Sequence, residues 1–173
     1  MPPSAVLILG VGNEWRGDDA IGVLLARRLR ERAPPGVEVK EHSGEGAGLM
    51  EEWVGHDAVI ILDAVRSGSP PGTIHRLDAS REAIPSRFFH ASSHAFSVAE
   101  AVELSRALGA LPEVVLLYGI EGREFAAGAG LSEEVRMGGA VVLEEVMALI
   151  ESYAGRLAVK SRTGTGTGSA SRS

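Results

Sequence analysis

Short apolar runs alternate with amphipathic stretches along most of this chain of 173 residues. Residues 58–62 form a continuous apolar run, which is typical of a strand buried on both faces of a parallel sheet. Related patterns predict five strands, at residues 6–9, 37–41, 58–62, 73–77 and 113–120, with the fourth at a sheet edge. Helical periodicity predicts helices at residues 20–32, 49–54, 93–108 and 132–153.

This alternation of strands and helices predicts the fold class. Right-handed crossovers between such elements produce a twisted, mainly parallel sheet with helices on both faces. We therefore expect a three-layer α/β protein with one domain over residues 1–158. Residues 159–173 are rich in Gly, Ser and Thr and have little to bury, so we expect them to form a disordered tail.

Polar and glycine-rich segments follow the first three predicted strands. In open α/β sheets, ligands bind in the crevice outside the carboxyl ends of the strands. This rule selects the turn at residues 13–19, the glycine-rich turn at residues 44–48, and Asp63. Asn13 is expected to satisfy backbone groups of its own turn. We expect these three segments to lie at the same end of the sheet.

Two adjacent carboxylates, Asp18 and Asp19, lie where the first turn becomes a helix. An aspartate at this position usually caps the helix or interacts with its dipole. Successive helical side chains point about 100° apart, so the two cannot perform the same task. A pyrophosphate would be repelled by this pair, whereas a cation could be bound.

The histidines fall into two groups. His90 and His94 lie at the N-terminus of a predicted helix, whose positive end disfavours the imidazolium form and so favours the neutral, metal-binding form. The other three, His42, His56 and His75, have no acidic partner visible in the sequence and are expected to be incidental. Two carboxylates and one imidazole from separate turns suit a borderline divalent ion with open coordination positions.

Composition narrows the function classes. The net charge of −6 argues against a nucleic-acid partner, which needs basic clusters. The absence of cysteine excludes disulfides, thiolate nucleophiles and Cys-ligated zinc. No apolar run approaches the roughly 18 residues of a transmembrane helix, and the N-terminus lacks the features of a signal peptide. We therefore expect a cytoplasmic protein without a membrane partner.

Several short motifs occur in a characteristic order. They are Gly-Val-Gly-Asn at 10–13, Asp-Asp-Ala-Ile-Gly at 18–22, Leu-Asp-Ala at 62–64, Pro-Gly at 71–72, Ser-His at 93–94, Tyr-Gly-Ile-Glu-Gly at 118–122 and Gly-Leu-Ser-Glu-Glu-Val at 130–135. In this order and spacing, the chain resembles the hydrogenase maturation endopeptidases over residues 6–150. These enzymes remove a C-terminal extension from the large subunit of nickel-iron hydrogenases after nickel insertion.

The resemblance implies a site and a partner. The nickel-contacting positions of the family correspond to Asp19, Asp63 and His94, and Asp18 is then a cap or a residue that supports the site. Nickel arrives with the precursor large subunit, so no permanent cofactor is expected, and the enzyme is expected to act as a monomer. The turn at residues 42–48 departs from the usual pattern because it lacks threonine and contains Glu45, which bears on specificity. The glycines around Asn13 are expected to bring the backbone close to a peptide.

The chemistry of cleavage stays open between two routes. Nickel could polarise the carbonyl or a water, or Asp19 or Asp63 could act as a general base, in which case the catalytic and metal-recognition roles are shared. Two other functions are alternatives: a non-catalytic nickel-binding chaperone and a Rossmann-like protein that binds a small ligand. The second lacks a third glycine at the dinucleotide spacing, where Trp15 stands.

Overall fold

The computed structural model describes residues 5–89 and 98–163, with the backbone alone described for residues 157–163. Its centre is a five-stranded sheet in the order β2-β1-β3-β5-β4. All neighbouring strands are parallel except β4, which pairs antiparallel with β5 at one edge. The strands are β1 (Val6–Val11), β2 (Val37–His42), β3 (Ala58–Val65), β4 (Ile74–Asp78) and β5 (Val114–Glu121).

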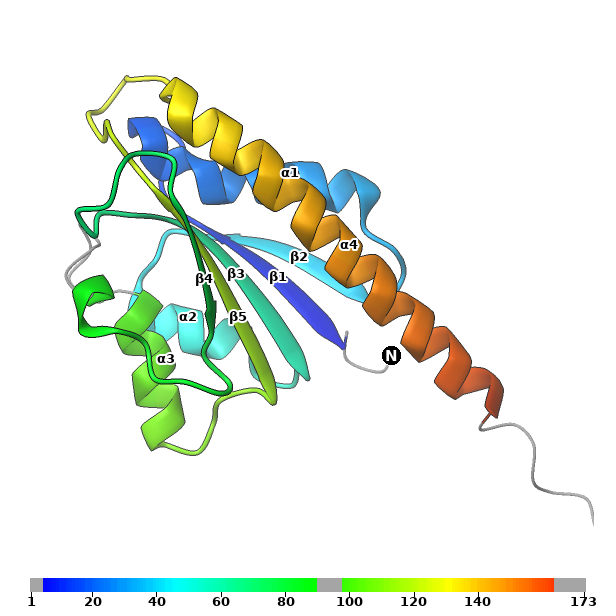
Figure 1. The fold of residues 1–173 in the computed structure, drawn as a ribbon. Helices are drawn as coiled ribbons and strands as arrows, with labels where there is room; N and C mark the ends of the chain where they lie inside the picture. The colour runs from blue at the N-terminus through cyan, green and yellow to red at the C-terminus, as the bar shows by residue number, and fades with distance from the viewer. Residues whose placement is uncertain (1–4, 90–97, 164–173) are drawn as a thin grey trace, which may run out of the picture.

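Helices cover both faces of the sheet (Figure 1). One face carries α1 (Ile21–Arg32) and the long α4 (Glu133–Thr163), and the other carries α2 (Gly46–Glu52) and α3 (Val98–Ala107). Two short 3-10 helices, η1 (Gly17–Ala20) and η2 (Ser86–Phe88), precede α1 and α3. The predicted three-layer α/β architecture and the predicted edge strand are therefore confirmed.

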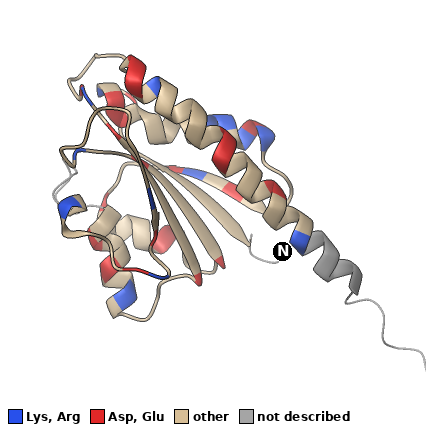
Figure 2. Ribbon diagram, in the orientation of Figure 1, with Lys and Arg blue, Asp and Glu red and all other residues tan. Residues whose placement is uncertain are grey.

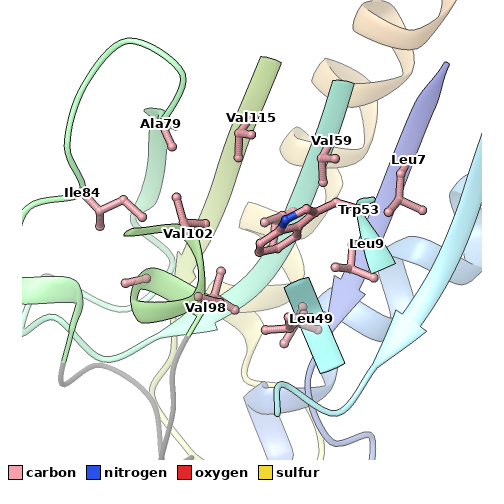
Figure 3. Close-up of a cluster of buried hydrophobic side chains, with 14 of the residues drawn as sticks. Leu7, Leu9, Leu49, Trp53, Val59, Ala79, Ile84, Val98, Val102 and Val115 are labelled. Atoms are coloured by element: carbon pink, nitrogen blue, oxygen red, sulfur yellow. The ribbon is translucent and has the colours of Figure 1, made fainter. Parts of the chain in front are cut away.

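The two faces of the sheet build two separate cores, because successive strand residues point to opposite sides. Leu7 and Leu9 of β1 pack with Trp53, which follows α2, and with Val102 of α3 (Figure 3). The intervening Ile8 packs on the other side, in a cluster that includes residues of α1 and α4. Burial on both faces explains the continuous apolar runs of β1 and β3.

Most element boundaries lie within two residues of the sequence-based prediction, but three differ more among the described residues. Strand β3 does not end at residue 62 but continues to Val65, because β5 runs alongside it as far as Glu121. Helix α2 begins at Gly46, inside the predicted turn. Helix α4 does not end at the predicted residue 153 but continues to Thr163, past the predicted domain end at residue 158, since residues 156–163 contain no glycine or proline to stop it. The remainder of the predicted tail, 164–173, lies outside the described residues.

Charged side chains lie on the helices, the connecting segments and the edge strands β2 and β4, with both signs interspersed (Figure 2). Arg27 of α1, for example, forms ion pairs with Glu14 and with Glu41 at the end of β2. Of the helices that the structure describes, none is both long and apolar enough to cross a membrane.

Candidate functional site

The candidate site lies at the topological switch point of the sheet, where the strand order reverses. Strand β1 leads through α1 to β2 on one side, and the chain then returns through α2 to β3 on the other side of β1. The crevice outside the carboxyl ends of β1 and β3 is therefore the expected ligand site of this topology. Asp19 lies in η1, directly after β1, and Asp63 lies in β3.

The register places Asp63 at this crevice. Pairing between β1 and β3 ends at Gly10 and Leu62, one residue before Asp63. On its other side Asp63 is still paired, with Gly119 of β5. The prediction placed Asp63 directly after this strand, whereas the structure places it within the strand. Its backbone is held by the sheet, which gives its carboxylate a more rigid support than a loop would.

Glycines allow η1 and α1 to approach the strands closely. Gly12 has a φ of +142°, and a Cβ atom there would overlap the carbonyl oxygen of Asp19. A Cβ on Gly22 would overlap the carbonyl oxygens of both Val11 and Leu62. The close approach that these two glycines permit is between segments of the chain itself, and it sets the position of Asp19. That the glycines around Asn13 also bring the backbone close to a peptide stays a prediction.

Asp19 is 7% exposed, and its Oδ2 accepts a hydrogen bond of 3.0 Å from the backbone N–H of Asn13. The Oδ1 of Asn13 in turn accepts a hydrogen bond of 2.9 Å from the backbone N–H of Trp15. Asn13 therefore organises its own turn, as predicted. The carboxylate of Asp19 has further acceptor positions with which it could bind a cation.

Asp18 has a different role from its neighbour. Its side chain is fully buried and accepts four hydrogen bonds, from the backbone N–H groups of Arg123, Glu124 and Ser132 and from the hydroxyl of Ser132, at 2.7–2.9 Å. Burial acts to raise the pKa of Asp18, but these hydrogen bonds outweigh it, so that the pKa is lowered from its usual value. Asp18 thus ties the turn after β1 to the segment that leads into α4, which is the supporting role predicted for it.

The pKa of Asp63 is shifted in the opposite direction from that of Asp18. Burial, followed by the negative charge of Asp19, raises the pKa of Asp63 well above its usual value, although the backbone N–H of Ala64 acts to lower it. Two carboxylates that share a buried space favour either a shared proton or a bound cation. The arrangement is therefore suited to receiving a positive charge.

His94, the third predicted nickel ligand, lies outside the described residues, as does His90. Among residues 5–89 and 98–163, no group of three His, Cys, Asp or Glu side chains is arranged to hold a metal ion. The three-residue ligand set of Asp19, Asp63 and His94 stays a prediction.

Two histidines that were expected to be incidental have acidic partners. His75 Nε2 lies 3.1 Å from Glu121 Oε2, and Glu121 is 2% exposed. His56 Nε2 lies 2.9 Å from Glu38 Oε2. The members of these pairs are 46 and 18 residues apart in the sequence, so no local pattern could have revealed them. His75 is the more important one, because it faces the same side of the sheet as Asp63.

The chain is similar to known proteins over most of its length. A family model described as hydrogenase maturation protease matches residues 23–149, a range that includes Asp63 and His94 and begins after Asp19. The chain is 31% identical over 149 residues to the hydrogenase 2 maturation protease of Escherichia coli (strain K12), covering 84% of this chain and 90% of that protein. It is 34% identical over 137 residues to the hydrogenase expression/formation protein HoxM of Azotobacter vinelandii, covering 76% of this chain and 65% of that protein.

Solved structures share the architecture. The hydrogenase maturating endopeptidase HybD from E. coli superimposes with a TM-score of 0.71 at 27% identity, covering 86% of this chain and 93% of that one. The hydrogenase maturation protease HycI from Thermococcus kodakarensis superimposes with a TM-score of 0.67, covering 86% and 93%; at 22% identity it supports the fold alone. The family model matches most of this chain, and the E. coli hydrogenase 2 maturation protease is similar to it over most of both chains. This chain therefore belongs to the hydrogenase maturation protease family and is a peptidase.

Proposed function

We propose that this peptidase removes the C-terminal extension of a nickel-loaded precursor of a hydrogenase large subunit. The observation that carries the proposal is the pair of carboxylates, Asp19 and Asp63, at the carboxyl ends of β1 and β3 in a member of this family. Burial, followed by the negative charge of Asp19, raises the pKa of Asp63, so the space between the two carboxylates favours a cation. Nickel held by the precursor would supply that cation.

Nickel is part of the substrate in this proposal, and Asp19, Asp63 and His94 complete its coordination. Two oxygens and one nitrogen suit a divalent ion of borderline softness that already has other ligands. Recognition of the loaded precursor then follows from differential affinity, because a precursor without nickel brings no charge to offset the repulsion between the carboxylates. No permanent cofactor is required.

Cleavage proceeds by attack of water on the scissile carbonyl. Nickel could polarise that carbonyl or the water, and the oxygen of Asp63 that does not bind nickel could accept the proton of the water. Both routes need Asp63 in its ionised form, and the positive charge of nickel stabilises that form. Recognition of the metal and preparation for catalysis are therefore linked in one side chain.

The test is a cleavage assay with nickel-loaded and nickel-free precursor, followed by mass spectrometry. We expect a loss of mass at the C-terminus with the loaded precursor only, and no cleavage by Asp63→Asn. The exposed Asp57 provides a matched control, since Asp57→Asn removes one carboxylate far from the crevice and should cleave normally.

Binding without a loss of mass would favour the chaperone alternative. Equal cleavage of the nickel-free and nickel-loaded precursors would contradict the proposal that the enzyme recognises nickel. Action as a monomer and location in the cytoplasm stay predictions.

A further inference from the structure

Three residues form a row across the sheet beside the candidate site. Asp63 of β3 pairs with Gly119 of β5, and Gly119 pairs with His75 of β4. Directly paired residues of neighbouring strands direct their side chains to the same face, here the face covered by α2 and α3. Because adjacent strands are about 4.8 Å apart, the backbones of Asp63 and His75 are separated by about 10 Å. Gly119 between them has no side chain, so the row has a gap at its centre.

A cavity of about 40 Å³ lies over this gap. Asp63 and His75 are its charged and polar lining residues, and the rest of its wall is mainly apolar, including Val65, Leu77, Ile84, Phe88 and Leu117. Its volume provides room for about three water molecules, which is comparable with a medium-sized aliphatic side chain. An apolar cavity is costly to leave empty, because its lining atoms lack contact partners.

The polar end of the cavity is held firmly in place. Glu121 contacts His75 and also accepts hydrogen bonds of 2.8 Å from both the backbone N–H and the hydroxyl of Ser67. The ring of Phe88 meets the imidazole of His75 edge to face, with centroids 5.0 Å apart. This wall therefore does not have to be ordered when a ligand enters, so the cavity is preformed.

We propose that this cavity binds an apolar side chain of the substrate, from one of the two residues that flank the scissile bond. The proposal rests on the proposed function, which places that bond at Asp63. Consecutive peptide residues are less than 4 Å apart, so a residue next to the scissile bond comes close to the cavity, because Asp63 itself lines it. The apolar wall then selects an aliphatic side chain over a charged one, which would lose its hydration there.

Substitution of Gly119 tests the proposal by filling the floor of the cavity. A Cβ at this position would lie 3.0 Å from Val65 Cγ1 and 3.7 Å from His75 Cβ, so Gly119→Ala requires only a small shift of one side chain. Nickel-loaded precursors with Ala, Val, Leu or Lys at each flanking position are compared by kcat/KM. We expect the wild type to prefer an aliphatic residue at one position and to cleave the Lys precursor poorly. In Gly119→Ala, the preference for Leu over Ala should fall about tenfold or more, with the Ala precursor still cleaved.

A second variant changes the cavity in the opposite direction. Leu117→Val removes a methylene from the wall and should shift the preference towards larger side chains. Leu116→Val is the matched control, because Leu116 belongs to the core on the other face of the same strand. Gly130→Ala controls for the glycine substitution, since a Cβ there meets nothing within 4 Å.

The outcomes separate this proposal from the proposed function. A wild type that cleaves all flanking variants equally, or an unchanged preference in both cavity variants, overturns the side-chain pocket and leaves the peptidase assignment standing. A wild type that cleaves no loaded precursor rejects the proposed function, and the pocket with it. Thermal melting of each variant verifies that it is folded before its kinetics are compared.

Discussion

Asp18→Asn should destabilise the protein strongly, although it changes one atom of one side chain. The two carboxylate oxygens of Asp18 accept four hydrogen bonds, and Oδ1 accepts the one from the backbone N–H of Ser132. An asparagine can accept with one oxygen only. If that oxygen takes the place of Oδ2, its NH₂ group faces the N–H of Ser132, and two donors meet in a buried space.

The magnitude follows from the lost partner. A hydrogen bond to a charged group contributes about 1.5–3 kcal/mol, and a buried donor without a partner costs about 1–3 kcal/mol. We therefore expect Asp18→Asn to lower the free energy of unfolding by about 2–4 kcal/mol, a large part of the typical total of about 5–15 kcal/mol. For a domain of this size, that corresponds to a decrease in Tm of roughly 5–15 °C.

Urea and thermal unfolding of Asp18→Asn at several pH values provide the assay. Since the pKa of Asp18 is lowered in the folded state, the unfolded state binds the proton more tightly. The stabilisation from Asp18 is therefore complete above its unfolded pKa of about 3.9 and is lost as the pH falls through the lower folded value. The difference between wild type and variant should be constant near neutral pH and should narrow below about pH 4.

Asp57→Asn is the control for these measurements, because Asp57 is exposed. Its free energy of unfolding should stay within about 0.5 kcal/mol of the wild type. Equal stability of Asp18→Asn and the wild type at pH 7, or a difference that persists unchanged at pH 3, would refute the reasoning about the buried hydrogen bonds.

Four further variants probe the site. Asp19→Asn keeps an oxygen for its turn, so its Tm should change by only a few degrees while cleavage falls at least about a hundredfold; a large loss of Tm in a melting curve would count against this division of roles. Asp63→Asn should be more stable than the wild type at pH 7, because the raised pKa of Asp63 means that the contribution of this residue to stability falls as the pH rises above its unfolded value of about 4. The urea midpoints of variant and wild type should differ at pH 7 and converge at pH 4. Gly12→Ala would press a Cβ against the carbonyl oxygen of Asp19 and should cost about 1–3 kcal/mol, together with cleavage; normal activity would show that the turn can relax. His94→Ala should weaken binding of the nickel-loaded precursor in calorimetry, whereas His56→Ala should not, and equal effects would remove His94 from the ligand set.

Choice of the control histidine depends on the tertiary structure. His75 has no acidic neighbour in the sequence, but in the fold it lies 3.1 Å from Glu121 and lines the same cavity as Asp63. A change at His75 would therefore affect the site itself. His56 lies two residues before β3, beyond the opposite end of that strand from Asp63, and is the appropriate comparison.

The sequence by itself determined the order of elements, the three-layer α/β class and the edge position of β4. These properties follow from local patterns: apolar runs of strand length, helical periodicity, and glycine or proline breaks between them. The rule that ligands bind outside the carboxyl ends of the strands also selected Asp19 and Asp63, because it requires only that the strands be parallel. The family motifs, which are short and contiguous, were visible for the same reason.

Only the tertiary structure showed which groups each polar side chain contacts. Asp18 and Asp19 are adjacent and chemically identical, yet Asp18 bonds to groups 105–114 residues away, whereas Asp19 bonds to Asn13 six residues away. The extension of β3 through Asp63 depended on how far β5 continues beside it. Hydrogen bonds and cavities form between atoms that folding brings together, and no pattern within one segment encodes a partner that lies in another. The row of Asp63, Gly119 and His75 therefore exists only as a consequence of strand register.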